Sequence, residues 1–132
     1  MAIQFDVATR NAMADAITSQ VGSNARLKIY DGTPPGNVGA SLSGNNLLVD
    51  LPCSATFAPS ASGGALTLNA ITTTNAAATG TASFFRLTTS GGTAKVQGTV
   101  GTTANDLNLT STSIVSGAPV AINSAVLTMP GA

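Results

Sequence analysis

The chain of 132 residues is long enough for one modest hydrophobic core, and a single domain spanning residues 1–132 is expected. Only 8% of the residues are charged, against roughly 25% in ordinary soluble domains, and five acidic side chains cancel five basic ones. Histidine and glutamate are absent, which excludes a Ser-His-Asp triad, an imidazole general base and a histidine-ligated zinc site. The sequence therefore predicts a protein that is not an enzyme.

The first predicted element is a helix over about residues 5–21. Its apolar positions recur every three or four residues and form the expected packing face: Phe5, Ala8, Ala12, Ala16 and Ile17. The carboxylate of Asp6 suits the positive end of the helix dipole, and Gly22 stands where a helix commonly ends. We expect this helix to lie flat against a sheet; the alternative is an element that docks on a partner.

Apolar and polar residues alternate directly after the helix, which is typical of a strand with one buried and one polar face. The apolar face consists of Ala25, Leu27 and Ile29. The polar face consists of Arg26, Lys28 and Tyr30, and Asp31 follows it. These four polar residues are the predicted partner contacts, together with the N-terminal segment and the next loop. The alternative is that the polar face is only solvated.

Glycine and proline then mark a long loop over residues 31–45, which we expect to be exposed. Further strands are predicted near residues 47–51, 66–70, 80–88, 94–100, 107–109, 114–115 and 120–127. The 80–88 strand has apolar residues on both faces, which indicates a central strand or one covered by a partner. Short strands with turns every 8–12 residues favour an antiparallel sandwich or barrel. We predict a mainly β, jelly-roll-like antiparallel β-sandwich of seven or eight strands with one N-terminal helix.

Cofactor and metal sites are not predicted. The five Asp residues are far apart, no phosphate-binding glycine loop occurs, and Asp31 or Asp106 alone make a poor calcium site. The single cysteine, Cys53, is expected to be a buried thiol; an intermolecular disulfide or a reactive thiol is the alternative. Basic residues are too scattered for nucleic acid or an anionic membrane surface.

Targeting patterns are also missing. The N-terminus lacks a basic start followed by an apolar run, and no stretch approaches the ~20 apolar residues of a membrane span. We therefore expect synthesis in a cytoplasm.

Several segments along the chain resemble small structural proteins of tailed bacteriophages and prophages. They are Met1–Phe5, Arg10–Ala12, Ala16–Ile17, Leu27–Gly32, Thr79–Arg86 and Asp106–Leu109. The resemblance implies a virion structural protein of the capsid decoration, or cement, type. Such a protein would be made in the bacterial host and bind the major capsid protein on the outer capsid surface as a homo-oligomer, a trimer or dimer. A tail or tail-tip structural protein and a host-surface or glycan-binding module are the alternatives.

Overall fold

The computed structural model describes residues 3–129, without the side chains of residues 123 and 124. One helix precedes eleven short strands in these residues. The elements are α1 (Val7–Val21), β1 (Arg26–Tyr30), β2 (Leu47–Pro52), β3 (Ala65–Thr67), β4 (Thr74–Asn75), β5 (Gly80–Thr81), β6 (Phe84–Thr88), β7 (Ala94–Gly101), β8 (Leu107–Leu109), β9 (Ser113–Ile114), β10 (Pro119–Val120) and β11 (Ile122–Thr128).

Helix α1 is bounded by the two residues that the sequence indicated, Asp6 before its first turn and Gly22 after its last. The carboxylate of Asp6 accepts a hydrogen bond from the backbone N–H of Thr9 at 2.8 Å and so caps the first turn. At the other end Gly22 has φ 71°, and its N–H donates to the carbonyl of Thr18 at 3.2 Å. The predicted helix is therefore confirmed, with its start two residues later than expected.

The buried face of α1 differs from the predicted one. Of the predicted positions, Ile17 is partly buried and packs against the core, whereas Phe5 and the three alanines are exposed. The buried residues of the helix are Ala14 and Val21. Alanine carries little apolar area, so the three alanines of the predicted face contribute less to packing than their spacing suggested.

Polar side chains of α1 fix the helix to the loop that precedes β3. Asn11 accepts from the N–H of Gly64 at 2.8 Å, and Asp15 accepts from the N–H of Ala61 at 2.7 Å. Both side chains are half-buried, and Asp15 lies seven positions after Ala8, beside the predicted apolar face. These hydrogen bonds to backbone amides help to fix how the helix docks.

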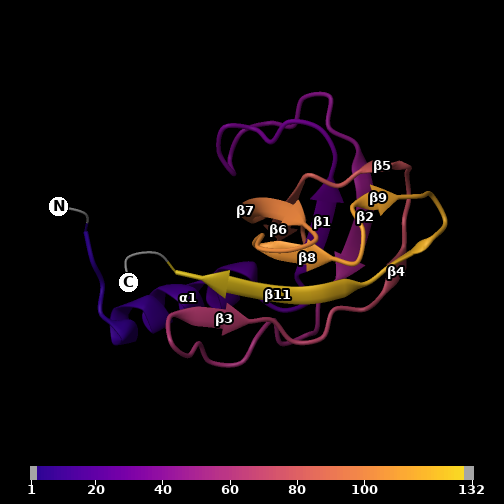
Figure 1. Ribbon diagram of the computed structural model, residues 1–132. Coiled ribbons are helices and arrows are strands. Elements are labelled where there is room, and N and C mark those ends of the chain that lie inside the picture. The colour runs from indigo at the N-terminus through magenta and orange to yellow at the C-terminus, as the bar shows by residue number, and fades with distance from the viewer. Residues whose placement is uncertain (1–2, 130–132) are drawn as a thin grey trace.

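Seven strands form one large sheet in the spatial order β2-β1-β6-β7-β8-β11-β3. Strands β11 and β3 run across the direction of β1 and β2 (Figure 1), and buried residues of both halves of the sheet join one core cluster. This sandwich-like arrangement confirms the predicted mainly β fold with one N-terminal helix. The strand pairs β10-β4 and β5-β9 are additional, with two residues in each strand.

One pair of neighbours departs from the predicted antiparallel pattern, because β7 and β8 run parallel. The pairing is limited to the end of β7, where Val100 lies opposite Leu107 and Gly101 opposite Asn108. Parallel pairing ordinarily needs a long crossover. Here a short loop suffices because the carboxylate of Asp106 accepts from both the N–H and the hydroxyl of Thr99, at 3.0 and 3.1 Å, and turns the chain.

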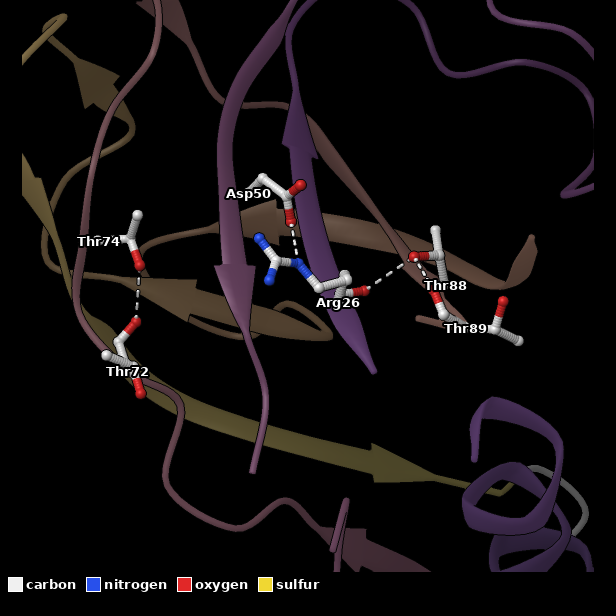
Figure 2. Close-up of polar contacts among 6 residues, drawn as sticks. All are labelled: Arg26, Asp50, Thr72, Thr74, Thr88 and Thr89. Atoms are coloured by element: carbon white, nitrogen blue, oxygen red, sulfur yellow. Dashed lines mark hydrogen bonds and ion pairs between the residues drawn. The ribbon is translucent and has the colours of Figure 1, made fainter. Parts of the chain in front are cut away.

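The edge strand β2 is covered by the segment that contains β4. The N–H of Ala77 donates to the carbonyl of Leu48 at 2.7 Å, and the N–H of Thr72 donates to Pro52 at 3.3 Å. The hydroxyl of Thr74 closes a local turn on the carbonyl of Thr72 (Figure 2). Because a sheet edge with unpaired backbone groups invites pairing with other chains, this cover limits self-association through β2.

The main core lies between the two halves of the sheet and α1, which packs against β3 and β7. Its largest fully buried side chains include Phe57, Phe85, Leu27, Ile29, Leu48, Leu51, Leu66, Leu87, Leu107 and Leu109. The apolar face predicted for residues 25–29 is confirmed, since Ala25, Leu27 and Ile29 are all buried. No helix within residues 3–129 has the length and apolar character to cross a membrane.

Gly98 on β7 tests how tightly this core is packed. A Cβ at Gly98 would lie 2.6 Å from the ring of Phe85 and 2.9 Å from the carboxylate of Asp106. We expect Gly98→Ala to lower the free energy of unfolding by about 1–3 kcal/mol, because neither neighbour can move without disturbing the sheet. The matched control is Gly36→Ala, whose added Cβ meets nothing within 4 Å and which should be neutral or slightly stabilising. Urea unfolding of both variants measures the two free energies of unfolding. Equal values for the two variants would contradict the tight packing at Gly98.

Candidate interaction surface

The candidate surface is the face of β1 and β6 that points away from the main core, together with the loop that covers it. We call this the outer face. Side chains alternate along a strand, so it consists of Arg26, Lys28 and Tyr30 from β1 and Phe84, Arg86 and Thr88 from β6. Three of the four predicted contact residues therefore lie side by side on one strand.

Arg26 is held within the sheet by an ion pair. Its Nε lies 2.9 Å from Oδ1 of Asp50 on β2, and both side chains are about a third exposed, at 39% and 32%. On the opposite side, the hydroxyl of Thr88 lies 3.5 Å from the carbonyl of Arg26 and 3.0 Å from that of Thr89 (Figure 2). Such a half-exposed ion pair fixes side-chain direction more than it stabilises the fold.

Lys28 lies at the centre of the outer face. In the register of the sheet it stands directly opposite Asp50 of β2 and Arg86 of β6. The three bases Arg26, Lys28 and Arg86 thus share this face with one carboxylate. The outer face is locally positive although the whole chain is neutral.

Tyr30 is buried, with 7% of its surface exposed, rather than solvated as a polar-face residue would be. Its ring stacks on Phe84 with the centroids 5.2 Å apart and the planes 16° from parallel. Both rings are buried but do not belong to the main core cluster. Burial raises the pKa of the Tyr30 hydroxyl. The outer face thus contains a second, small apolar cluster.

Asp31 closes the base of the loop between β1 and β2. Its carboxylate accepts from the backbone N–H of Asn46 at 2.7 Å and from the side-chain amide of Asn46 at 3.1 Å. These hydrogen bonds hold the pKa of Asp31 below its usual value. The amide of Asn45 donates to the carbonyls of Asp31 and Thr33, at 2.8 and 3.0 Å. Asp31 therefore shapes the loop, in agreement with the turn predicted at its start.

Side chains of the sheet bind the middle of this loop, residues 31–46. Arg86 is 7% exposed, and its Nη2 donates to the carbonyls of Ala40 and Asn37 at 2.7 and 3.4 Å. Gln97 of β7 accepts from Nε of Arg86 at 2.9 Å and donates to the carbonyl of Pro35 at 3.0 Å. The hydroxyl of Ser83 donates to the carbonyl of Gly32 at 2.6 Å. The loop, which arches beside β7 in Figure 1, is therefore tied to the outer face along its length.

Sequence reasoning missed Arg86 and Gln97 as organisers of this surface. One signal was present: an arginine between Phe85 and Leu87 in an otherwise apolar strand must be buried with partners or break the strand. The identity of those partners was not visible, because the carbonyls of the loop lie more than forty positions earlier in the chain.

All five carboxylates have structural partners. Asp6 caps α1, Asp15 binds the N–H of Ala61, Asp31 binds Asn46, Asp50 pairs with Arg26, and Asp106 binds Thr99.

The thiol of Cys53 is buried, and burial raises its pKa from 9.0 to about 11. It is therefore protonated at neutral pH. The part of the chain that the structure describes holds no group of three or more carboxylate or thiol side chains placed to bind a metal ion.

Comparisons of the chain with protein-family models, with curated proteins and with solved structures found no match. The resemblance to phage structural proteins therefore remains a prediction.

Replacing Arg86 should release the loop. We expect Arg86→Met to lower the free energy of unfolding by about 1–3 kcal/mol, because the carbonyl of Ala40 and the amide of Gln97 lose their partner. Amide hydrogens of residues 36–44 should exchange faster with solvent. The matched control is Arg26→Met, which breaks a half-exposed ion pair and should cost under about 1 kcal/mol without affecting loop exchange. Unchanged exchange in Arg86→Met would show that the loop holds itself in place.

Cys53 should make the fold sensitive to alkali. Its pKa is raised from 9.0 to about 11 in the folded chain, so the unfolded chain loses this proton first. The stability that depends on the protonated thiol is fully present below pH 9 and is lost as the pH rises toward 11. We expect the melting temperature of the wild type to fall more steeply than that of Cys53→Ala over this interval. Parallel curves for the two proteins would contradict the burial of the thiol.

Proposed function

We propose that the chain is a structural protein of a bacteriophage virion, a capsid decoration protein that binds the outer surface of the major capsid lattice and stabilises it. The resemblance of its segments to small phage structural proteins supports the choice of partner. The physical character of its surface supports a role in packing rather than in chemistry. The partner lattice, the virion location and the oligomeric state are parts of this proposal.

The observation that carries the proposal is the loop of residues 31–46, which is exposed along most of its length and yet tied to the sheet by Ser83, Arg86 and Gln97. Asp31 is its sole charged residue, and that carboxylate is engaged with Asn46. A fixed loop loses little conformational entropy when a partner binds, and its short uncharged side chains need little desolvation. Such a surface suits a permanent contact with a repeating lattice.

In this mechanism each bound copy spans neighbouring capsid subunits and adds buried interface between them. The added contacts must break before the subunits can separate, so the assembled shell resists the pressure of the packaged genome. Leu42, on the exposed side of the loop and 37% accessible, is the apolar group best placed for the lattice contact. Lys28 and Arg26 lie on the same outer face of the sheet and favour an acidic neighbour.

A glycan-binding module receives less support. Sugar-binding surfaces commonly stack sugars on exposed aromatic rings. Tyr30, Phe57, Phe84 and Phe85 are buried in this chain, and Phe5 is 36% exposed. Four of the five aromatic side chains therefore fill cores, and one exposed ring does not form a platform.

Quantitative mass spectrometry of purified virions tests the proposal. We expect the protein in a fixed ratio to the major capsid protein, in copies numbering a substantial fraction of the lattice subunits. A few copies confined to the tail would assign it to the tail structure instead, and its absence from virions would reject a structural role.

The same particles can locate the contact if virions lacking the protein are mixed with purified variants. We expect Leu42→Asp to weaken binding at least about tenfold, because it places a charge in an apolar contact. The control Val115→Asp carries the same change at a residue 55% exposed and outside the loop, and it should bind normally.

A further inference from the structure

An exposed apolar arm precedes α1. The structure has six large hydrophobic side chains that are exposed among its described residues, and three of them are Ile3, Phe5 and Val7, at 76%, 36% and 48% exposure. They alternate with polar residues over five positions, so they do not form a hydrophobic face of α1 that could pack on the main core. Apolar groups concentrated in this way mark a contact surface more often than apolar groups scattered singly.

The base of this arm is fixed to the body of the protein. Nε of Arg10 donates to the carbonyl of Phe5 at 3.2 Å, and Nη1 of the same guanidinium lies 3.5 Å from the carbonyl of Gly63. Asp6 caps α1 immediately afterwards. Figure 1 shows that the chain from Ile3 to the start of α1 leads away from the strands of the sheet. The arm therefore projects in a defined direction.

A groove lined by uncharged residues lies between the end of β3 and β11. Its volume is about 300 Å³, enough for one or two apolar side chains, and it is lined by residues 67–71 together with Ile122, Ala125 and Val126. None of these lining residues is charged. Val126 is 38% exposed, so an apolar side chain of β11 remains accessible at this groove.

We propose that the arm of one copy inserts Ile3 and Phe5 into the β3–β11 groove of a second copy of this chain. The arm leads away from β3 and β11 of its own molecule (Figure 1), which leaves the groove of another molecule as its site. The segment from Ile3 to Phe5 and the groove lining both lack charged residues, so neither brings an unpaired charge into the contact. The net charge of zero also removes long-range repulsion between copies.

This contact is heterologous, because it joins an arm on one copy to a groove on the next. An open chain of copies therefore keeps one free arm at one end and one free groove at the other until it closes into a ring. A symmetric dimer in which the same patch meets itself does not have this property. The inference concerns contacts between copies in solution and does not rest on capsid binding, so either proposal can fail while the other holds.

Analytical ultracentrifugation of the purified chain tests the contact. We expect the wild type to self-associate and Ile3→Asp and Val126→Asp each to weaken association at least about tenfold, because burial of an apolar group is replaced by burial of a charge. The control Val115→Asp adds the same charge at an exposed residue outside arm and groove, and it should associate like the wild type. Thermal melting verifies that each variant is folded. A monomeric wild type, or equal weakening by all three substitutions, would overturn the proposal.

Mixing the two weakened variants distinguishes a heterologous contact from a symmetric one. Ile3→Asp retains an intact groove and Val126→Asp retains an intact arm, so together they should form a 1:1 complex that does not grow further. If Val126→Asp does not fold, disulfide trapping replaces it. Ile3→Cys and Val126→Cys, each in a Cys53→Ala background, should crosslink to each other on oxidation and not to themselves. Absence of the mixed complex or of the mixed crosslink would falsify the arm-in-groove contact.

Discussion

The surface of this protein depends on one buried cation. Arg86 lies in a central strand with 7% of its surface exposed. Its guanidinium donates to the carbonyls of Ala40 and Asn37 and to the amide oxygen of Gln97, which are all neutral acceptors. Burying a charged group is costly unless its hydrogen bonds are satisfied. The loop of residues 31–46 supplies two of the three acceptors and Gln97 of β7 the third, so the arginine and the loop require each other.

This mutual requirement explains the two-sided burial of β6. All five of its residues are buried, although the main core lies on one face only. On the other face Ser83 and Arg86 donate hydrogen bonds to the loop. Between them lies Phe84, whose ring stacks on Tyr30. The sequence pattern of β6 had predicted either a central strand or a face covered by a partner. Part of the chain itself provides the cover, and its exposed side becomes the surface available to other molecules.

Sequence patterns correctly predicted the features that depend on near neighbours in the chain. Asp6 and Gly22 bounded α1 because capping involves neighbours within a turn, and Ala25, Leu27 and Ile29 marked the inner face of β1 because side chains alternate along any strand. The docked face of α1 was predicted only in part, since it also depends on Asn11 and Asp15 binding amides about fifty residues away. The position of Tyr30 was also misjudged, because its burial depends on a stacked ring from β6.

The sequence by itself determined the mainly β class, the N-terminal helix and the scarcity of charge, because these follow from composition and from spacings within a few residues. Tertiary structure alone decided the parallel β7–β8 pair, the binding of the 31–46 loop by Arg86 and Gln97, and the separation of the Ile3–Phe5 arm from the β3–β11 groove. Each of these features depends on the distance in space between groups, and that distance cannot be read from their positions in the sequence. Hydrogen-bond satisfaction and burial select such pairings only when the whole chain has folded.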